Sequence, residues 1–131
     1  MIVVDTNVMV HLVTGGVQGE AAARLLRDDP EWMAPPILLS ELRNVLLGFV
    51  RRGQASVEDA AAMLADAAEV LGDRVVTVRG RPVLETALQC ELSAYDAEFV
   101  VLARTLGVPL ATADVGILQG APDVAVELGR T

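Results

Sequence analysis

Two aspartates follow short apolar runs at places where a ligand site can form. Asp5 comes directly after Ile2–Val4, and Asp114 comes shortly after Val108–Ala111. Runs that are apolar on both faces are typical of strands in a buried parallel sheet. Ligands in such sheets bind beyond the carboxyl ends of the strands. We therefore expect Asp5 and Asp114 to lie at one edge of a sheet.

Two further acids fall within the apolar stripe of a predicted helix. Glu41 shares a helix face with Leu38 and Val45, and Asp96 shares one with Phe99. Asp96 also stands in a first helical turn, where the helix dipole favours an anion. Burying an unpaired carboxylate costs several kcal/mol, so these acids need positive partners. The sequence offers few arginines nearby, and a bound cation would supply the missing charge.

The types of side chain indicate which cation this would be. Asp5, Glu41, Asp96 and Asp114 offer only carboxylate oxygens, which suit one or two Mg²⁺ or Mn²⁺ ions rather than zinc. We expect Asp5 and Asp96 to ligate directly. Glu41 is expected to ligate or to orient water, and Asp114 to hold a second or outer-sphere ion. Two ions, if present, would lie roughly 3.5–4 Å apart.

Each acid also has an explanation that needs no metal. Asp5 alone could cap the helix that follows it, and Asp114 alone could be a turn or cap residue. Asp96 alone could be a favourable charge at a helix start, and Glu41 could lie at a solvated rim. One shared metal site explains all four at once, which four separate coincidences do less well.

The composition excludes several other chemistries. The formal net charge is −8 and all ten basic residues are arginine, so there is no lysine for a Schiff base, a Walker A loop or a receiver-type site. The single histidine, His11, lies in a predicted helix away from the acids, which speaks against a histidine general base. Metal-assisted hydrolysis is the remaining route.

The bulk properties predict a soluble cytoplasmic protein. Cys90 is the only cysteine, which rules out an intramolecular disulfide and fits a reducing compartment; we expect it to be a small buried side chain on a helix. A strand-like run and an acid stand at the amino end in place of a signal peptide. No uncharged apolar stretch approaches the ~18 residues of a membrane span.

Hydrophobic periodicity and helix caps predict alternating strands and helices in one domain, 1–131. The predicted strands are 2–4, 33–34, 75–78, 108–111 and 124–126. The predicted helices are 6–13, 20–27, 35–52, 57–71, 82–91 and 94–106, with a short helical turn after Asp114. Ser56 and Asp59 have the spacing of a capping box. The fold class is therefore α/β with a mostly parallel sheet.

Four segments of this chain carry a family resemblance. They are Val4–Asn7, Ser40–Leu46, Ser93–Ala97 and Leu110–Asp114. In this order they resemble the four acidic motifs of PIN-domain proteins, and the order and chain length resemble the VapC toxins of bacterial type II toxin–antitoxin systems. The resemblance covers nearly the whole chain. A lone Asp-Thr-Asn is a weak signal, but four ordered motifs are specific.

The resemblance implies a three-layer α/β/α sandwich with a PIN-like central sheet. It implies an endoribonuclease that uses Mg²⁺ or Mn²⁺, forms homodimers and is inhibited by a co-expressed antitoxin protein. Attack by water would leave a 5′-phosphate and a 3′-hydroxyl. The acids carried over to the site are Asp5, Glu41, Asp96 and Asp114.

The motifs also suggest residues that support the acids. Thr6, Asn7 and Thr112 match supporting polar positions. Glu98 is an additional acid, but two residues from Asp96 on a helix it should point to another face. One departure stands out: family members often carry basic residues after the fourth acid, whereas this chain continues Val-Gly-Ile. This puts substrate contacts at that edge in doubt, but not the metal site.

An acidic chain conflicts with an RNA substrate, because phosphate binding is normally driven by basic surface. Several of the acids form the site itself, and bound metal would offset them. Contacts with RNA would then fall to arginines. Arg43, Arg51 and Arg52 are candidates because they share the helix of Glu41, although each is equally consistent with a solvated helix position.

Two other functions compete with the nuclease. One is an aspartyl-nucleophile phosphatase acting through Asp5. That chemistry needs a second acid two residues later and a lysine, whereas this chain has Asn7 and no lysine. The other is a catalytically silent PIN-like module that only binds a partner. The complete acid set argues against it.

Overall fold

A four-stranded parallel sheet lies at the centre of the computed structural model, which describes residues 1–130. The strands are β1 (Ile2–Val4), β2 (Trp32–Met33), β3 (Leu110–Thr112) and β4 (Ala125–Glu127), in the order β2-β1-β3-β4. Val3 of β1 pairs with Met33 on one side and Leu110 on the other. All three pairings are parallel, so the carboxyl ends of the strands meet at one edge.

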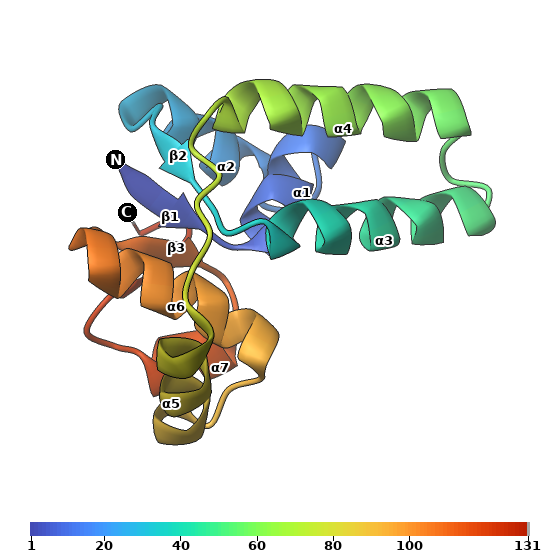
Figure 1. Cartoon of the computed structure of the whole chain (residues 1–131). Coiled ribbons are helices and arrows are strands. Elements are labelled where there is room, and N and C mark those ends of the chain that lie inside the picture. Colours follow the sequence, from blue (N-terminus) through green and yellow to red (C-terminus); the bar gives the residue numbers. More distant parts are fainter. Residues whose placement is uncertain (131) are drawn as a thin grey trace.

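Helices cover both sides of this sheet. They are α1 (Thr6–Thr14), α2 (Gly19–Asp28), α3 (Ile37–Arg51), α4 (Val57–Leu71), α5 (Gly80–Cys90), α6 (Ala94–Leu106) and α7 (Val115–Gly120). Figure 1 shows α1 to α4 on one side of the strands and α5 to α7 on the other, with α3 and α4 extending as a hairpin. The expected three-layer α/β/α fold is thus confirmed.

The core follows from the apolar patterns that predicted the elements. β1 is wholly buried, as a central parallel strand must be. On α3, Leu38, Leu42 and Leu46 recur every fourth residue and are all buried. On α6 an unbroken run from Phe99 to Ala103 is buried, because this helix packs directly against β1 and β3.

The predicted strand 75–78 does not form. Val75 makes a single parallel bridge to Ala34, and the chain then continues without ladder partners to α5. β3 also starts later than predicted, at Leu110. Val108 still donates its N–H to Ala103 at the end of α6 (3.1 Å), and Pro109 has no N–H to offer a ladder.

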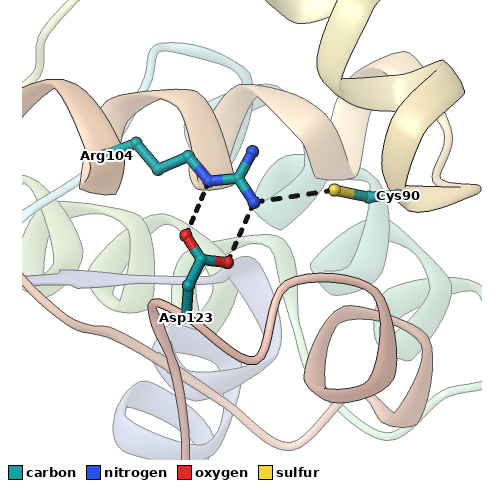
Figure 2. Close-up of polar contacts among 3 residues, drawn as sticks. All are labelled: Cys90, Arg104 and Asp123. Atoms are coloured by element: carbon teal, nitrogen blue, oxygen red, sulfur yellow. Dashed lines mark hydrogen bonds and ion pairs between the residues drawn. The ribbon is translucent and has the colours of Figure 1, made fainter.

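An exposed ion pair joins α6 to the segment that precedes β4. The Nε and Nη2 atoms of Arg104 donate to the two carboxylate oxygens of Asp123, both at 2.9 Å. Nη2 also lies 3.8 Å from the Sγ atom of Cys90, as Figure 2 shows. Cys90 is buried at the end of α5, as predicted. Arg104 therefore links three elements of the carboxyl-terminal half.

The helices of residues 1–130 include none that combines the length and the apolar character needed to cross a membrane.

Candidate active site

The carboxyl edge of the sheet holds both strand-terminal aspartates. Asp5 follows β1 and caps α1, accepting a hydrogen bond from the N–H of Val8 at 3.0 Å. Asp114 follows β3 and caps α7, accepting one from the N–H of Ile117 at 3.0 Å. The capping explanation and the placement expected for a shared site are therefore both true of these two acids.

Asp96 stands in a Ser-x-x-Asp pattern that makes only one of the two hydrogen bonds of a capping box. In α4, Ser56 and Asp59 form a complete capping box, with the Asp59 carboxylate returning to the Ser56 N–H at 3.1 Å. In α6, Ser93 likewise accepts from the Asp96 N–H at 3.0 Å. Among residues 1–130, however, no hydrogen bond returns from the Asp96 carboxylate to Ser93. That carboxylate instead lines a cleft.

The four acids share one cleft of about 120 Å³. Its lining residues come from α1, α3, α6, the ends of β1 and β3, and α7: Asp5, Thr6, Asn7, Glu41, Val45, Asp96, Phe99, Asp114 and Ile117. Larger hollows of about 520 and 540 Å³ lie elsewhere, but neither contains any of the four acids. The smaller cleft is the place where the sequence motifs meet.

Hydroxyl groups, rather than basic side chains, contact the carboxylates of two of these acids. Thr6 donates to Oε1 of Glu41 at 2.6 Å, although the two residues are 35 positions apart. Thr112 donates to Oδ2 of Asp5 and accepts from the N–H of Asp114 at 2.9 Å. No ion pair among residues 1–130 includes any of the four acids. Their negative charge is therefore not compensated by side chains of the described protein.

The uncompensated charge changes the acidity of the site. Burial raises the pKa of Asp5 to about 6, and the charges of Asp114 and Asp96 act in the same direction. Burial also raises the pKa of Asp96 above its ordinary value, with further contributions from Asp114 and Glu41. Such mutual effects arise only between neighbouring charges. The site therefore favours either a proton or a cation.

The cleft has the chemistry of a divalent-cation site. Its lining offers four carboxylates and no basic, histidine or cysteine side chain. Within residues 1–130, no group of three or more acidic, histidine or cysteine side chains is placed so that it could hold a metal ion together. An open set of oxygen donors suits Mg²⁺, which keeps several of its waters and is bound by few carboxylates. The residues present fit such an ion.

The supporting residues take up different positions around the acids. Asn7 is exposed and lines the cleft beside Thr6. Glu98 is outside the lining, yet burial and the charge of Glu41 raise its pKa. It therefore lies nearer the site than its helical spacing suggested. Helical spacing determines where Glu98 points relative to Asp96. It does not determine where α3, which carries Glu41, packs against α6.

The three candidate arginines do not line the cleft. Arg43, Arg51 and Arg52 are exposed on or at the end of α3. Arg52 lies over the ring of Phe49, 5.1 Å from its centroid, and donates to Gln54 at 3.2 Å. Contact between these arginines and RNA stays a prediction.

Sequence reasoning placed Val45 and Phe99 beside the acids but missed Ile117 and one close approach. Val45, Phe99 and Ile117 form the apolar part of the cleft. A Cβ atom on Gly116 would lie 3.0 Å from Oδ1 of Asp114, so a larger residue there would crowd this carboxylate. The short helical turn predicted after Asp114 was the one signal that pointed to this region.

Comparison with known proteins gives one family and several similar folds. The family described as PIN domain matches residues 2–121. PAE2754 from Pyrobaculum aerophilum has 19% identity and a TM-score of 0.77, over 98% of this chain and 83% of that one. A toxin–antitoxin complex from Klebsiella pneumoniae contains a chain with 18% identity and a TM-score of 0.66, over 96% of each chain. FitAcB from Neisseria gonorrhoeae has 20% identity and a TM-score of 0.70, over 97% and 96%. No curated protein matches the sequence.

Proposed function

Because this chain belongs to the PIN-domain family, we propose that it is an endoribonuclease that uses Mg²⁺ or Mn²⁺ and acts as the toxin of a VapBC-type toxin–antitoxin pair. PIN domains are generally nucleases. The observation that carries the proposal is the convergence of Asp5, Glu41, Asp96 and Asp114 on one cleft that contains no basic side chain.

These four acids would hold the cation. When bound, it supplies Lewis-acid chemistry, lowering the pKa of water and offsetting negative charge on the phosphate. Asp5 is held from two sides, by the N–H of Val8 and the hydroxyl of Thr112. Two partners fix its orientation more firmly than either would alone, which suits a direct ligand.

Glu41 is the residue we assign to the attacking water. Thr6 donates to its Oε1 atom, and no hydrogen bond among residues 1–130 uses Oε2, which would accept a proton from water. Water would form the new bond to phosphorus while the bond from phosphorus to the 3′ oxygen breaks, and that oxygen would take up a proton from solvent. The products are a 5′-phosphate and a 3′-hydroxyl. His11 is outside the cleft lining and has no part in this step.

The form of the cleft favours exposed backbone over paired bases. A space of about 120 Å³ admits a phosphate group, whereas a paired helix would have to approach from outside. Single-stranded loops and ends offer the phosphate most freely. The net charge of −8 further predicts weak, salt-sensitive RNA binding outside the site.

Cleavage of labelled RNA with and without Mg²⁺ or Mn²⁺ tests the proposal. We expect cleavage by the unaltered protein, and its loss in Asp5→Ala and Asp96→Asn by more than about 100-fold, the upper end of what losing an outer-sphere partner costs. Asp73→Asn is the matched control, because it removes an exposed acid that does not line the cleft.

Other outcomes would replace the proposal. Phosphate release from small esters without RNA cleavage would favour an aspartyl-nucleophile phosphatase. RNA or protein binding that is indifferent to both substitutions would favour a silent binding module. Mapping of the product ends checks the direction of attack, because a 2′,3′-cyclic phosphate would contradict a water nucleophile.

A homodimer is supported by the outer face of α5. Leu84 and Leu88 are 63% and 83% exposed and lie one helical turn apart, and Tyr95 is 60% exposed at the start of α6. Neighbouring exposed apolar side chains, such as Leu84 and Leu88, are typical of interfaces. We expect Leu88→Glu to reduce the mass in sedimentation equilibrium to that of a monomer, with Val57→Glu, an exposed valine on α4, as the control.

An antitoxin partner is supported by the likeness to a chain of a toxin–antitoxin complex. If the pair exists, a short neighbouring reading frame should encode a protein that co-purifies with this chain and blocks RNA cleavage. A neighbouring protein that binds without blocking cleavage would contradict the antitoxin role while leaving the nuclease assignment intact.

A further inference from the structure

The segment 75–79 forms an open edge of the sheet. Its link to the sheet consists of two hydrogen bonds, from the N–H of Ala34 to the Arg74 carbonyl at 3.2 Å and from the N–H of Val76 to the Ala34 carbonyl at 2.9 Å. Because successive residues of an extended chain point to opposite sides, the polar backbone groups of Val75 and Thr77 face away from Ala34. No hydrogen bond among residues 1–130 uses those groups.

The sequence of this segment is that of a strand that lacks a neighbour. Residues 75–78 read Val-Val-Thr-Val, all β-branched, and Arg79 has extended backbone angles, with φ −82° and ψ 146°. Figure 1 shows the segment as an open trace that runs from α4 past β2 to α5. Arg74 covers the preceding edge position, donating to the Trp32 carbonyl at 3.0 Å. Only the part after Arg74 is free to pair.

A groove runs beside this edge. It has a volume of about 430 Å³ and lies between the segment and α6. Its walls are mainly apolar: Val76, Val78 and Pro82 on one side, and Val101, Leu102 and Leu106 on the other. Arg79 is the only charged residue of the lining, and Arg81, two residues further on, is exposed and pairs with Glu85 at 3.7 Å.

We propose that this edge and groove bind an extended peptide segment of a partner protein, which adds a strand beside 75–79. The free backbone groups of Val75 and Thr77 would supply the pairing, and the groove would take alternate apolar side chains. The bound peptide would carry an acidic residue next to Arg79. This inference is independent of the proposed nuclease activity, because none of its residues lines the acidic cleft.

Charge indicates which kind of chain would pair with this edge. Arg79, the one charged residue of the groove lining, attracts an acidic side chain and repels a basic one. Pairing of two copies through this edge would leave Arg79 without an acid, since residues 75–79 contain none. A partner segment with apolar and acidic residues satisfies both features.

A synthetic heptapeptide tests the proposal. The probe alternates valine with threonine, has blocked ends and carries glutamate at both end positions, so that either strand direction places an acid near Arg79. We expect it to shift the amide signals of Val75 and Thr77 in a ¹⁵N NMR titration and to slow exchange of their amide protons. The same peptide with lysine at both ends should bind at least about 10-fold more weakly.

Variants at Thr77 separate backbone pairing from simple apolar contact. Thr77→Pro removes an N–H that has no partner in the free protein, so the fold and any RNA cleavage should persist, while the dissociation constant rises at least about 10-fold. Thr77→Val keeps the N–H and should bind within about 2-fold of the unaltered chain. Arg79→Glu should reverse the preference between the two peptides.

Three results would overturn the proposal. One is equal binding by Thr77→Pro and Thr77→Val, which would show that no backbone pairing occurs. Another is equal binding of the glutamate and lysine peptides. The third is self-association in sedimentation velocity that Thr77→Pro abolishes, which would assign the edge to a second copy. Loss of RNA cleavage in Asp5→Ala without change in peptide binding would leave the proposal standing.

Discussion

The hydroxyl of Thr112 on β3 donates a hydrogen bond to the carboxylate of Asp5 beyond β1, across 107 residues of sequence. The same hydroxyl accepts a hydrogen bond from the N–H of Asp114. One buried side chain therefore sets the positions of both acids at the carboxyl edge of the sheet. It does so because β1 and β3 are paired neighbours in register, Val4 opposite Ala111.

Thr112→Val tests this coupling, because it keeps the shape of the side chain and removes the hydroxyl. We expect a 10–100-fold loss of Mn²⁺ affinity, the usual cost of removing a hydrogen-bond partner of a metal ligand. Stability should fall by about 1–3 kcal/mol, since buried polar groups lose their partner. Isothermal titration calorimetry and urea unfolding measure the two effects. Thr112→Ser restores the hydroxyl and should recover most of the affinity; equal losses in both variants would contradict the coupling.

The pKa of Asp5 predicts how the metal-free protein responds to pH. This pKa is about 6 in the folded chain and 3.8 in the reference state, so folding favours the protonated form. Below pH 3.8 Asp5 is protonated in both the folded and the unfolded chain, so it does not change the free energy of unfolding. As the pH rises from 3.8 to 6 the unfolded chain releases its proton first, and stability falls by about 3 kcal/mol.

Asp5→Asn removes that titration. In EDTA-treated protein, we expect the variant to be more stable than the unaltered chain above about pH 6 and to lose this advantage near pH 4. Urea unfolding across this pH range gives the difference directly. Mg²⁺ should stabilise the unaltered chain at pH 7.5 more than it stabilises the variant. An advantage that is the same at every pH would refute the assignment of the raised pKa to Asp5.

Close packing between α5 and α7 predicts a position that tolerates only glycine. A Cβ atom on Gly120 would lie 2.5 Å from the carbonyl oxygen of Cys90. We expect Gly120→Ala to destabilise the protein by about 1–3 kcal/mol, as overpacking does. Gly80→Ala is the control, because its Cβ would meet nothing within 4 Å. Thermal unfolding should leave that control unchanged or slightly stabilised.

The ion pair between Arg104 and Asp123 predicts a small effect that depends on pH (Figure 2). Both side chains are partly exposed, so Asp123→Asn should cost less than about 1 kcal/mol at pH 7. The hydrogen bond from Arg104 lowers the pKa of Asp123 below 3.8. The loss of stability caused by Asp123→Asn should therefore be constant above pH 3.8, and it should disappear as the pH falls through the lowered pKa of Asp123. Acid titration of both proteins by circular dichroism measures it.

Local sequence determined the elements and the identity of the acids. Apolar runs and caps predicted every helix to within a few residues and four of five strands. The failed strand, 75–78, has strong β-branched propensity, but propensity cannot supply a neighbour with free backbone groups. Asp5 and Asp114 were identifiable because acids that end buried strands conflict with the surrounding pattern.

Tertiary structure decided what each acid does there. The Ser-x-x-Asp pattern occurs at both Ser56 and Ser93, yet only Asp59 completes its capping box, while Asp96 lines the acidic cleft. Local spacing is the same in the two helices, so sequence alone could not separate them. The difference lies in what faces each carboxylate: Asp59 is exposed, whereas α6 packs on the sheet, which brings Asp96 to the edge where residues from distant parts of the chain meet.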